Sequence, residues 1–286
     1  MRTFKALIII IFVLAILPIT ASHSQTSGWE ETYFKANMAY KQGRFSESVD
    51  GYTQLIRAGY KNGHMYYNLG NAYLRMDLSG YAILNYERAR ILIPRDADLK
   101  YNLKYARDRI QDAIEEPHGF LEMAFFWIGS TNMMELFYCF AGLNIFFWGI
   151  LFVRLFKKTE WIYYASMILF IVWMISGTSL GIKWYLLNTD DRAVILEKEA
   201  NIHAGPDAKD TLLFKLHEGT VVHHERSEEG WSIISLPDKK RGWINNGALK
   251  NIINNEPLSK RFSLVKLKAG ENFNHRNTVS ISRIEI

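Results

Sequence analysis

The residues that most resemble a catalytic motif form a short run at 177–181. The run reads Gly-Thr-Ser-Leu-Gly, which matches the G-x-S-x-G pattern of serine hydrolases. In those enzymes the serine needs a sharp turn between a strand and a helix, whereas here it lies within a long apolar run. We therefore interpret Gly177 and Gly181 as a small-residue face for close packing of two helices. The small residues that could pack against this face are Ala141, Gly142 and Gly149.

The other reactive side chains are scattered and form no recognisable catalytic or metal-binding group. Cys139 is the one cysteine, so the chain can form no internal disulfide and no zinc site built on cysteines. His223 and His224 are adjacent, and neighbours on a strand point to opposite faces, which argues against a shared metal. No cluster of His, Asp or Glu has metal-ligand spacing. The sequence therefore predicts no catalytic residue, no metal, no cofactor and no enzymatic activity.

Two apolar runs in the middle of the chain set its organisation. They cover 133–155 and 161–185, and each is long enough for a helix that crosses a bilayer core of roughly 30 Å. The turn between them, at 156–160, is short, and together with Arg154 it is basic. Because short basic loops stay in the cytoplasm, we predict an inner-membrane hairpin with both soluble domains on the periplasmic side.

Three further segments fit this topology. Residues 1–24 have a basic start, an apolar run and small residues ahead of Gln25, which predicts a signal peptide; an uncleaved anchor would give the same topology. Residues 116–132 are too short to span a membrane and predict an interfacial segment. Residues 253–286 predict a flexible basic tail. The net charge of +5 comes partly from the turn and this tail, so no dense basic face indicates nucleic acid.

Residues 25–115 carry a helical pattern that repeats every 34 residues. The second copy has the aromatic, leucine, glycine and alanine spacing of a tetratricopeptide repeat, and the first is a weaker copy. A final helix forms a half repeat that caps the stack. We predict helices at 29–42, 46–58, 64–76, 79–92 and 96–114. The residues that define the repeat are Ala36, Ser48, Tyr52, Leu69, Gly70, Tyr73, Ala82, Tyr86, Ala89 and Pro94.

The first helix of each pair should line a concave face of this stack. Tyrosines, asparagines and basic residues recur on that side at helical spacing. Such a face could hold an extended peptide, because amides pair with its backbone and Lys or Arg with its carboxylates. The alternative is an ordinary solvated helix face. The candidate partner-binding residues are Tyr33, Asn37, Tyr40, Lys41, Tyr67, Asn71, Arg75, Tyr101, Tyr105 and Arg109.

From 188 to 252 the pattern changes to short β segments separated by Gly, Pro and Asp turns, which predicts a small barrel. The order of segments resembles a bacterial SH3-like domain, through 201–206, 216–220 and Gly242-Trp243-Ile244. His203 stands where that family usually has arginine, so its binding residues are not carried over at this point. We expect Trp231 and Trp243 in the core rather than on a ligand platform.

The sequence thus predicts a multi-domain α protein with a membrane α-hairpin and a small all-β domain: a tetratricopeptide α-solenoid, two transmembrane helices and an SH3-like β-barrel. This order of parts resembles the Bacteroides aerotolerance protein E (BatE) family, and the residues at 66–73, 86–89 and 94–98 carry most of the resemblance. The resemblance implies a non-enzymatic partner of membrane-bound von Willebrand factor A-domain proteins and a MoxR-type AAA ATPase, with a role in envelope stress or oxygen tolerance.

Three functions therefore compete. The first is an inner-membrane scaffold whose repeats and barrel each bind a protein partner. The second is a cell-wall module, in which the barrel binds peptidoglycan and the repeats recruit an enzyme. The third is a cell-wall peptidase, which would need an accessible cysteine near a histidine. Since Cys139 is expected to lie in lipid, the sequence argues against the peptidase.

Overall fold

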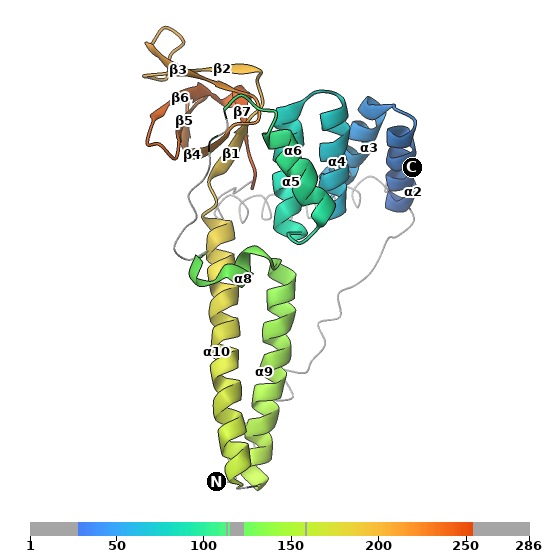
Figure 1. Ribbon diagram of the computed structural model, residues 1–286, viewed down its shortest axis with the longest axis vertical. Helices are drawn as coiled ribbons and strands as arrows, with labels where there is room; N and C mark the ends of the chain where they lie inside the picture. The colour runs from blue at the N-terminus through green and yellow to red at the C-terminus, as the bar shows by residue number, and fades with distance from the viewer. Residues whose placement is uncertain (1–27, 113, 115–122, 158, 254–286) are drawn as a thin grey trace, which may run out of the picture. The chain divides into compact units, whose positions relative to one another are not determined.

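The structure is a computed structural model that describes residues 28–112, 114, 123–157 and 159–253 (Figure 1). The predicted signal peptide at 1–24 lies outside the described residues, as does the predicted tail apart from Ile253. Within the described part, the chain forms eight α-helices and one antiparallel β-sheet. Two of the helices are long and apolar enough to cross a membrane.

The N-terminal helices follow one another as two hairpins and a single helix. They are α2 (Trp29–Lys41), α3 (Phe45–Arg57), α4 (Gly63–Arg75), α5 (Ser79–Leu92) and α6 (Ala97–Arg107). The Asn62 side chain caps α4 by accepting from the Met65 amide at 2.8 Å, and Asp96 caps α6 in the same way. The helix expected to run to residue 114 ends at Arg107 instead, because Ile110 and Asp112 turn away to contact the β-sheet.

Small residues allow the paired helices to approach closely. A Cβ atom placed on Gly70 of α4 would lie 2.6 Å from the Tyr86 ring of α5, and one on Gly51 of α3 would lie 2.9 Å from the Ala36 side chain of α2. Ala82 of α5 is completely buried where α4 crosses α5. Close packing of this kind depends on side-chain volume at the contact point.

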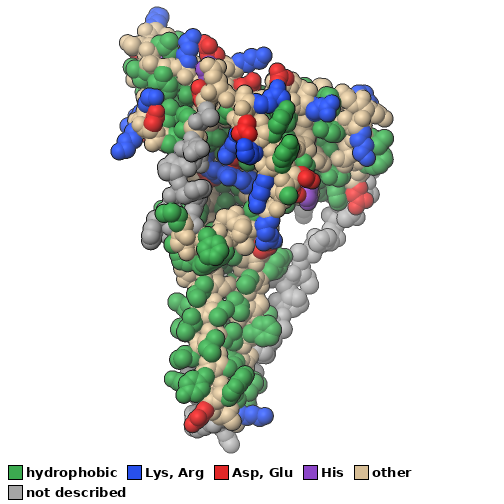
Figure 2. Space-filling view, viewed as in Figure 1, with side chains coloured by type: hydrophobic (Ala, Val, Ile, Leu, Met, Phe, Trp, Pro, Cys, Tyr) green, Lys and Arg blue, Asp and Glu red, His purple; other side chains and the backbone are tan. Residues whose placement is uncertain are grey.

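The two long helices are α9 (Met133–Phe156) and α10 (Glu160–Asn188). Figure 2 shows hydrophobic side chains over most of their visible face, with charged side chains near the ends. Asn132 and Glu135 form a reciprocal capping box at the start of α9. Glu135 also pairs with Arg95, so this carboxylate near the end of the helix is compensated.

Aromatic rings fill the space between α9 and α10. Phe147 stacks on Trp173 with ring centroids 5.3 Å apart, and Phe140 stacks on the same indole at 5.8 Å. The structure differs here from the expected glycine contact. A Cβ atom on Gly177 would meet the Phe140 ring at 3.1 Å, whereas one on Gly181 would meet nothing within 4 Å. Gly142 and Gly149 face similarly open space. Gly177 therefore packs closely against an aromatic ring of α9 rather than against a small residue.

A short segment joins the repeats to the hairpin. Its helix α8 (Phe126–Gly129) is the described core of the segment predicted to lie at the interface. The Trp127 indole donates to the Ser179 hydroxyl at 3.1 Å, and the Lys183 ammonium donates to the Ile128 carbonyl at 3.0 Å. These contacts attach the segment to α10. Phe126 remains 76% exposed.

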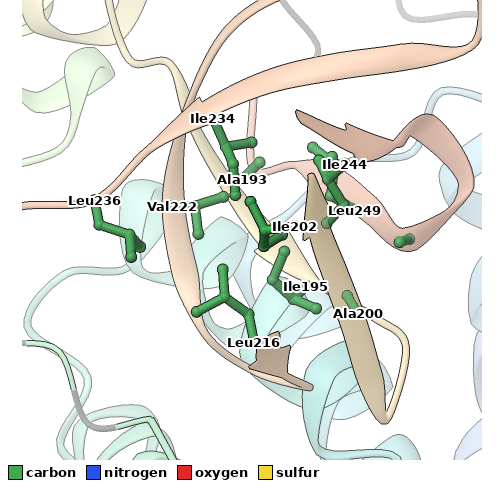
Figure 3. Packing of buried hydrophobic residues seen from close by; sticks show 11 residues of the cluster. Ala193, Ile195, Ala200, Ile202, Leu216, Val222, Ile234, Leu236, Ile244 and Leu249 are labelled. Carbon is green, nitrogen blue, oxygen red and sulfur yellow. The ribbon is translucent and has the colours of Figure 1, made fainter. Parts of the chain in front are cut away.

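The C-terminal domain is one antiparallel sheet with strand order β3-β2-β6-β5-β4-β1-β7. Its strands are β1 (Arg192–Ile195), β2 (Glu199–His203), β3 (Leu212–His217), β4 (Val221–Glu228), β5 (Trp231–Ser235), β6 (Arg241–Asn245) and β7 (Leu249–Asn251), with a 3-10 turn η1 (Asn246–Ala248) before the last. Figure 3 shows the core that the sheet encloses, where aliphatic side chains such as Ile202, Ile234 and Ile244 meet.

The repeat helices and the β-sheet share a second core. Val194 of β1 and Ile252 after β7 pack in the same cluster as Ile83 of α5. The Arg88 guanidinium donates to the carbonyls of Asn251 and Ile252 at 2.8 and 2.9 Å. The α5 helix therefore joins the two domains through both apolar and polar contacts.

Candidate functional site

A hydrogen-bonded group of tyrosines and asparagines links the first two helical hairpins. The Tyr52 hydroxyl donates to Asn37 Oδ1 at 2.6 Å. Asn68 Nδ2 donates to the same Asn37 oxygen and to the Tyr33 hydroxyl, both at 3.3 Å. The group combines side chains of α2, α3 and α4, so it fixes the angle between successive hairpins.

The same group recurs 34 residues later. The Tyr86 hydroxyl donates to Asn71 Oδ1 at 2.7 Å. Asn102 Nδ2 donates to that oxygen at 2.9 Å and to the Tyr67 hydroxyl at 3.0 Å. Four residues and three hydrogen bonds are therefore duplicated, so the 34-residue period of the sequence also appears in the structure.

Burial keeps the two donor hydroxyls protonated. Tyr52 and Tyr86 are 1% and 0% exposed. Loss of hydration raises the pKa of the Tyr52 hydroxyl to about 12 and also raises the pKa of Tyr86. Both therefore act as neutral donors, and each holds the oxygen of a half-buried asparagine amide.

The network leaves a defined set of polar atoms for a ligand. Asn37 and Asn71 use their oxygens internally; the Nδ2 group of Asn37 has no partner among the described residues, and the Asn71 amide also lies beside the Tyr67 hydroxyl. Asn68 and Asn102 use Nδ2, and their oxygens are likewise without a described partner. Each copy thus offers N–H donors beside a carbonyl acceptor, which is the complement of a peptide main chain.

A row of basic residues follows the same period. Lys41, Arg75 and Arg109 lie 34 residues apart and all are exposed at or just beyond helix ends. The Arg75 guanidinium stands over the Phe45 ring at 5.0 Å, which positions it without neutralising it. Arg109 donates to the Tyr105 hydroxyl at 2.9 Å and approaches Asp77 at 3.7 Å.

The remaining tyrosines differ in exposure. Tyr40 is half-buried beside Phe45, whereas Tyr101 and Tyr105 are 71% and 45% exposed on α6. The structure therefore divides the predicted face into residues bound in the network and residues that face solvent. Sequence reasoning did not assign Asn68 and Asn102 to this face, although their identity at a spacing of 34 was a usable signal.

Of the residues singled out in the β domain, His203 contacts Trp231, with ring centroids 5.6 Å apart, whereas His223 and His224 have separate partners. His223 Nδ1 is 2.7 Å from an Asp191 carboxylate oxygen, and His224 Nε2 is 2.9 Å from the Ser227 hydroxyl. Trp231 and Trp243, expected in the core, are only partly buried, because the aliphatic side chains fill the interior. Within the part of the chain that the structure describes, no group of three His, Cys, Asp or Glu side chains could hold a metal ion.

Comparison with known proteins defines the class of the C-terminal domain. Residues 197–251 match the bacterial SH3 domain family. The match covers strands β2 to β7, so the C-terminal domain is SH3-like and of a type that binds proteins or cell-wall material. A search of curated proteins gave no match to the chain.

Proposed function

We propose that this protein is a non-enzymatic membrane scaffold whose helical repeats, of the tetratricopeptide type, bind an extended peptide segment of a protein partner. The observation that carries the proposal is the duplicated tyrosine–asparagine group with its row of cations. Each copy presents side-chain amide groups that complement a peptide main chain, and the copies are one repeat apart. A single bound segment could therefore contact both.

The charge of the face defines the preferred partner. Three cations lie along the repeat face, at Lys41, Arg75 and Arg109. Asp77 compensates part of the charge of Arg109. Charge-assisted hydrogen bonds from such cations to carboxylates are about twice as strong as neutral ones. The partner segment should therefore be acidic. By its resemblance to the BatE family, the scaffold would work with von Willebrand factor A-domain proteins and a MoxR-type ATPase in aerotolerance or envelope stress.

The binding test uses isosteric changes at the two asparagines. In Asn37→Asp and Asn71→Asp the side-chain oxygen still accepts from tyrosine, but the free N–H donors become acceptors. We expect each change to weaken an acidic peptide by about 10-fold, from a lost hydrogen bond and added repulsion. Peptides would be selected from a phage-displayed library on the full chain in nanodiscs, and affinities measured by fluorescence anisotropy.

The matched control is Asn62→Asp, which makes the same chemical change at the N-cap of α4, where aspartate also caps well. It should leave peptide affinity unchanged. Selected peptides that bind all three variants equally, or a selection that yields no acidic peptides, would contradict the proposal.

We also propose that the hairpin lies in the inner membrane with both soluble domains on the periplasmic side. The two membrane-length helices and the basic turn support this orientation. Alkaline phosphatase fused after Ile253 should be active, whereas the same enzyme inserted after Lys157 should be inactive. The reverse pattern would place both domains in the cytoplasm and remove any cell-wall role.

A cell-wall function is the second candidate, and the SH3 family match favours it because such domains bind proteins or wall material. In this function the β domain binds peptidoglycan while the repeats recruit an envelope enzyme. Retention of the full chain on purified peptidoglycan, unaffected by the Asn37→Asp and Asn71→Asp changes, would support it.

A further inference from the structure

The SH3-like domain contains a small hollow that none of the functions above uses. Its volume is about 180 Å³. Glu197, Glu199, Asn201 and His203 line it from β2 and the loop before that strand, and Trp231 closes it from β5. The floor is rigid, because Ile244 and Ala200 are each 1% exposed and belong to the core of the domain (Figure 3).

The imidazole of His203 presents a buried hydrogen-bond acceptor to this hollow. The residue is 9% exposed, and its Nδ1 lies 2.9 Å from the carbonyl oxygen of Asp210. A carbonyl can only accept, so Nδ1 carries a proton, and in the neutral imidazole Nε2 then carries a lone pair. Nε2 has no partner among the described residues. The Trp231 ring meets the imidazole edge-on at 5.6 Å and holds it in place.

Two carboxylates stand beside this acceptor. Glu199, Asn201 and His203 alternate along β2 and therefore share one face of the strand. Lys215 pairs with Glu199 at 2.6 Å, so Glu199 is partly compensated. Glu197 is exposed and has no partner among the described residues. The hollow consequently has a net negative charge.

We propose that this hollow binds the primary ammonium group of a peptide, from a lysine-type side chain or an amino terminus. An ammonium group has three N–H donors and no acceptor, which matches the His203 lone pair and the Glu197 carboxylate. The Trp231 ring also lines the hollow, and indole rings attract cations. The volume equals that of about six water molecules, enough for an ammonium on a short aliphatic chain.

Two asparagine amides indicate that the ligand is a peptide. Asn201 has no described partner for its amide, and Asn245 uses its oxygen to accept from the Gly247 amide at 2.8 Å, which leaves its N–H donors. Both side chains line the hollow. They can pair with main-chain groups on either side of the bound ammonium.

The first test compares two short peptides on the full chain in nanodiscs. One is acetyl-Ala-Lys-Ala-amide, and the other carries acetyl-lysine, which removes the charge and two donors. Binding is followed by the ¹⁵N resonance of His203 Nε2, assigned by its loss in a His203→Arg variant. We expect the lysine peptide to shift this resonance and to bind at least about 10-fold more tightly than the acetylated one. Equal affinities would overturn the proposal.

Two charge-matched variants locate the site. Glu197→Gln should weaken the lysine peptide by about 3-fold to 10-fold, whereas Glu228→Gln, which removes the same charge outside the hollow, should not. His203→Arg places a cation in the hollow and should abolish binding, while its N–H groups can still donate to Asp210. Equal weakening by both glutamine variants would show a general charge effect and would also overturn the proposal.

The source of the ammonium and the independence of the site follow from two further measurements. Soluble wall peptides with intact amines should bind more tightly than the lysine tripeptide if the natural ligand is cell wall, and no more tightly if it is a protein. Asn37→Asp and Asn71→Asp should leave ammonium binding unchanged, so that failure of the repeat-face proposal and failure of this one are separable.

Discussion

Replacing Glu87 with glutamine is expected to destabilise the packing of α5 against its neighbours by about 2–4 kcal/mol. Glu87 is 0% exposed and is surrounded by three guanidinium groups. Arg90 lies 2.7 Å from one carboxylate oxygen and Arg192 of β1 lies 3.6 Å from it, while Arg107 of α6 pairs with the other oxygen. Arg192 keeps its pair with Asp190 at 2.7 Å, but Arg90 and Arg107 lose their buried partner, and breaking a buried ion pair typically costs about 3–5 kcal/mol.

We place the expected cost somewhat lower because two of the arginines can turn towards solvent. The side chains of Arg90 and Arg107 are 39% and 40% exposed, whereas that of Arg192 is 18% exposed. Hydrogen exchange of the full chain measures the effect locally. Amides of α5 and β1 should exchange about 30-fold to 1,000-fold faster in Glu87→Gln, at about 1.4 kcal/mol for each factor of ten.

The control for this substitution is Glu47→Gln. Its carboxylate pairs with Arg44, but both side chains are more than half exposed, and such surface pairs contribute at most about 1 kcal/mol. Exchange in α3 should change by less than about 5-fold. Equal effects at the two positions would show that the buried cluster does not hold the domains together.

A second polar contact joins the repeats to the sheet. Asp112 accepts from the His217 amide at 2.7 Å and from the Thr220 hydroxyl at 3.0 Å. Burial would raise the pKa of this carboxyl, but the bonds from His217 and Thr220 together lower it below its usual value. The stability it contributes is therefore present above the unfolded pKa of about 4 and is lost as pH falls through the lower folded pKa.

These contacts between the helices and the sheet show which parts of the fold could be predicted from the sequence. Helix positions in the repeats follow from local spacing, and the small side chains at Ala36, Gly70 and Ala82 occupy the crossings where their size is needed. The end of α6 does not follow from local spacing. It depends on Ile110 and Asp112 meeting residues about one hundred positions later in the chain, and no periodic pattern encodes such a contact.

The candidate site was also predictable only in part, because its hydrogen bonds join different helices. Asn37 and Asn71 were placed on the repeat face by helical spacing, but spacing does not show which amide atom is already bonded. Tyr52 and Tyr86 reach them from the second helix of each pair. In the hairpin, glycine spacing suggested contact between small residues, whereas Gly177 faces the Phe140 ring and Phe147 stacks on Trp173 between the helices.

Substituting Gly70 by alanine is expected to destabilise the α4–α5 hairpin by about 2–3 kcal/mol. Intrinsic helix preference alone would favour alanine by about 1 kcal/mol. The added Cβ, however, would lie 2.6 Å from the Tyr86 ring and 3.2 Å from the carbonyl oxygen of Ala82. Tyr86 is fully buried and its hydroxyl is bonded to Asn71, so its ring cannot move without losing that bond. Overpacking should therefore outweigh the propensity gain.

A double-mutant cycle identifies the clash as the cause. The Tyr86→Leu change removes the ring, so Gly70→Ala should cost at least about 1.5 kcal/mol less in that background than in the wild type. The opening free energy of α5 amides, measured by hydrogen exchange, gives all four values. As a control, Gly149→Ala adds the same atom to α9, where it would meet nothing within 4 Å, and should not destabilise that helix. Additive effects of Gly70→Ala and Tyr86→Leu would show that the ring does not set the helix spacing.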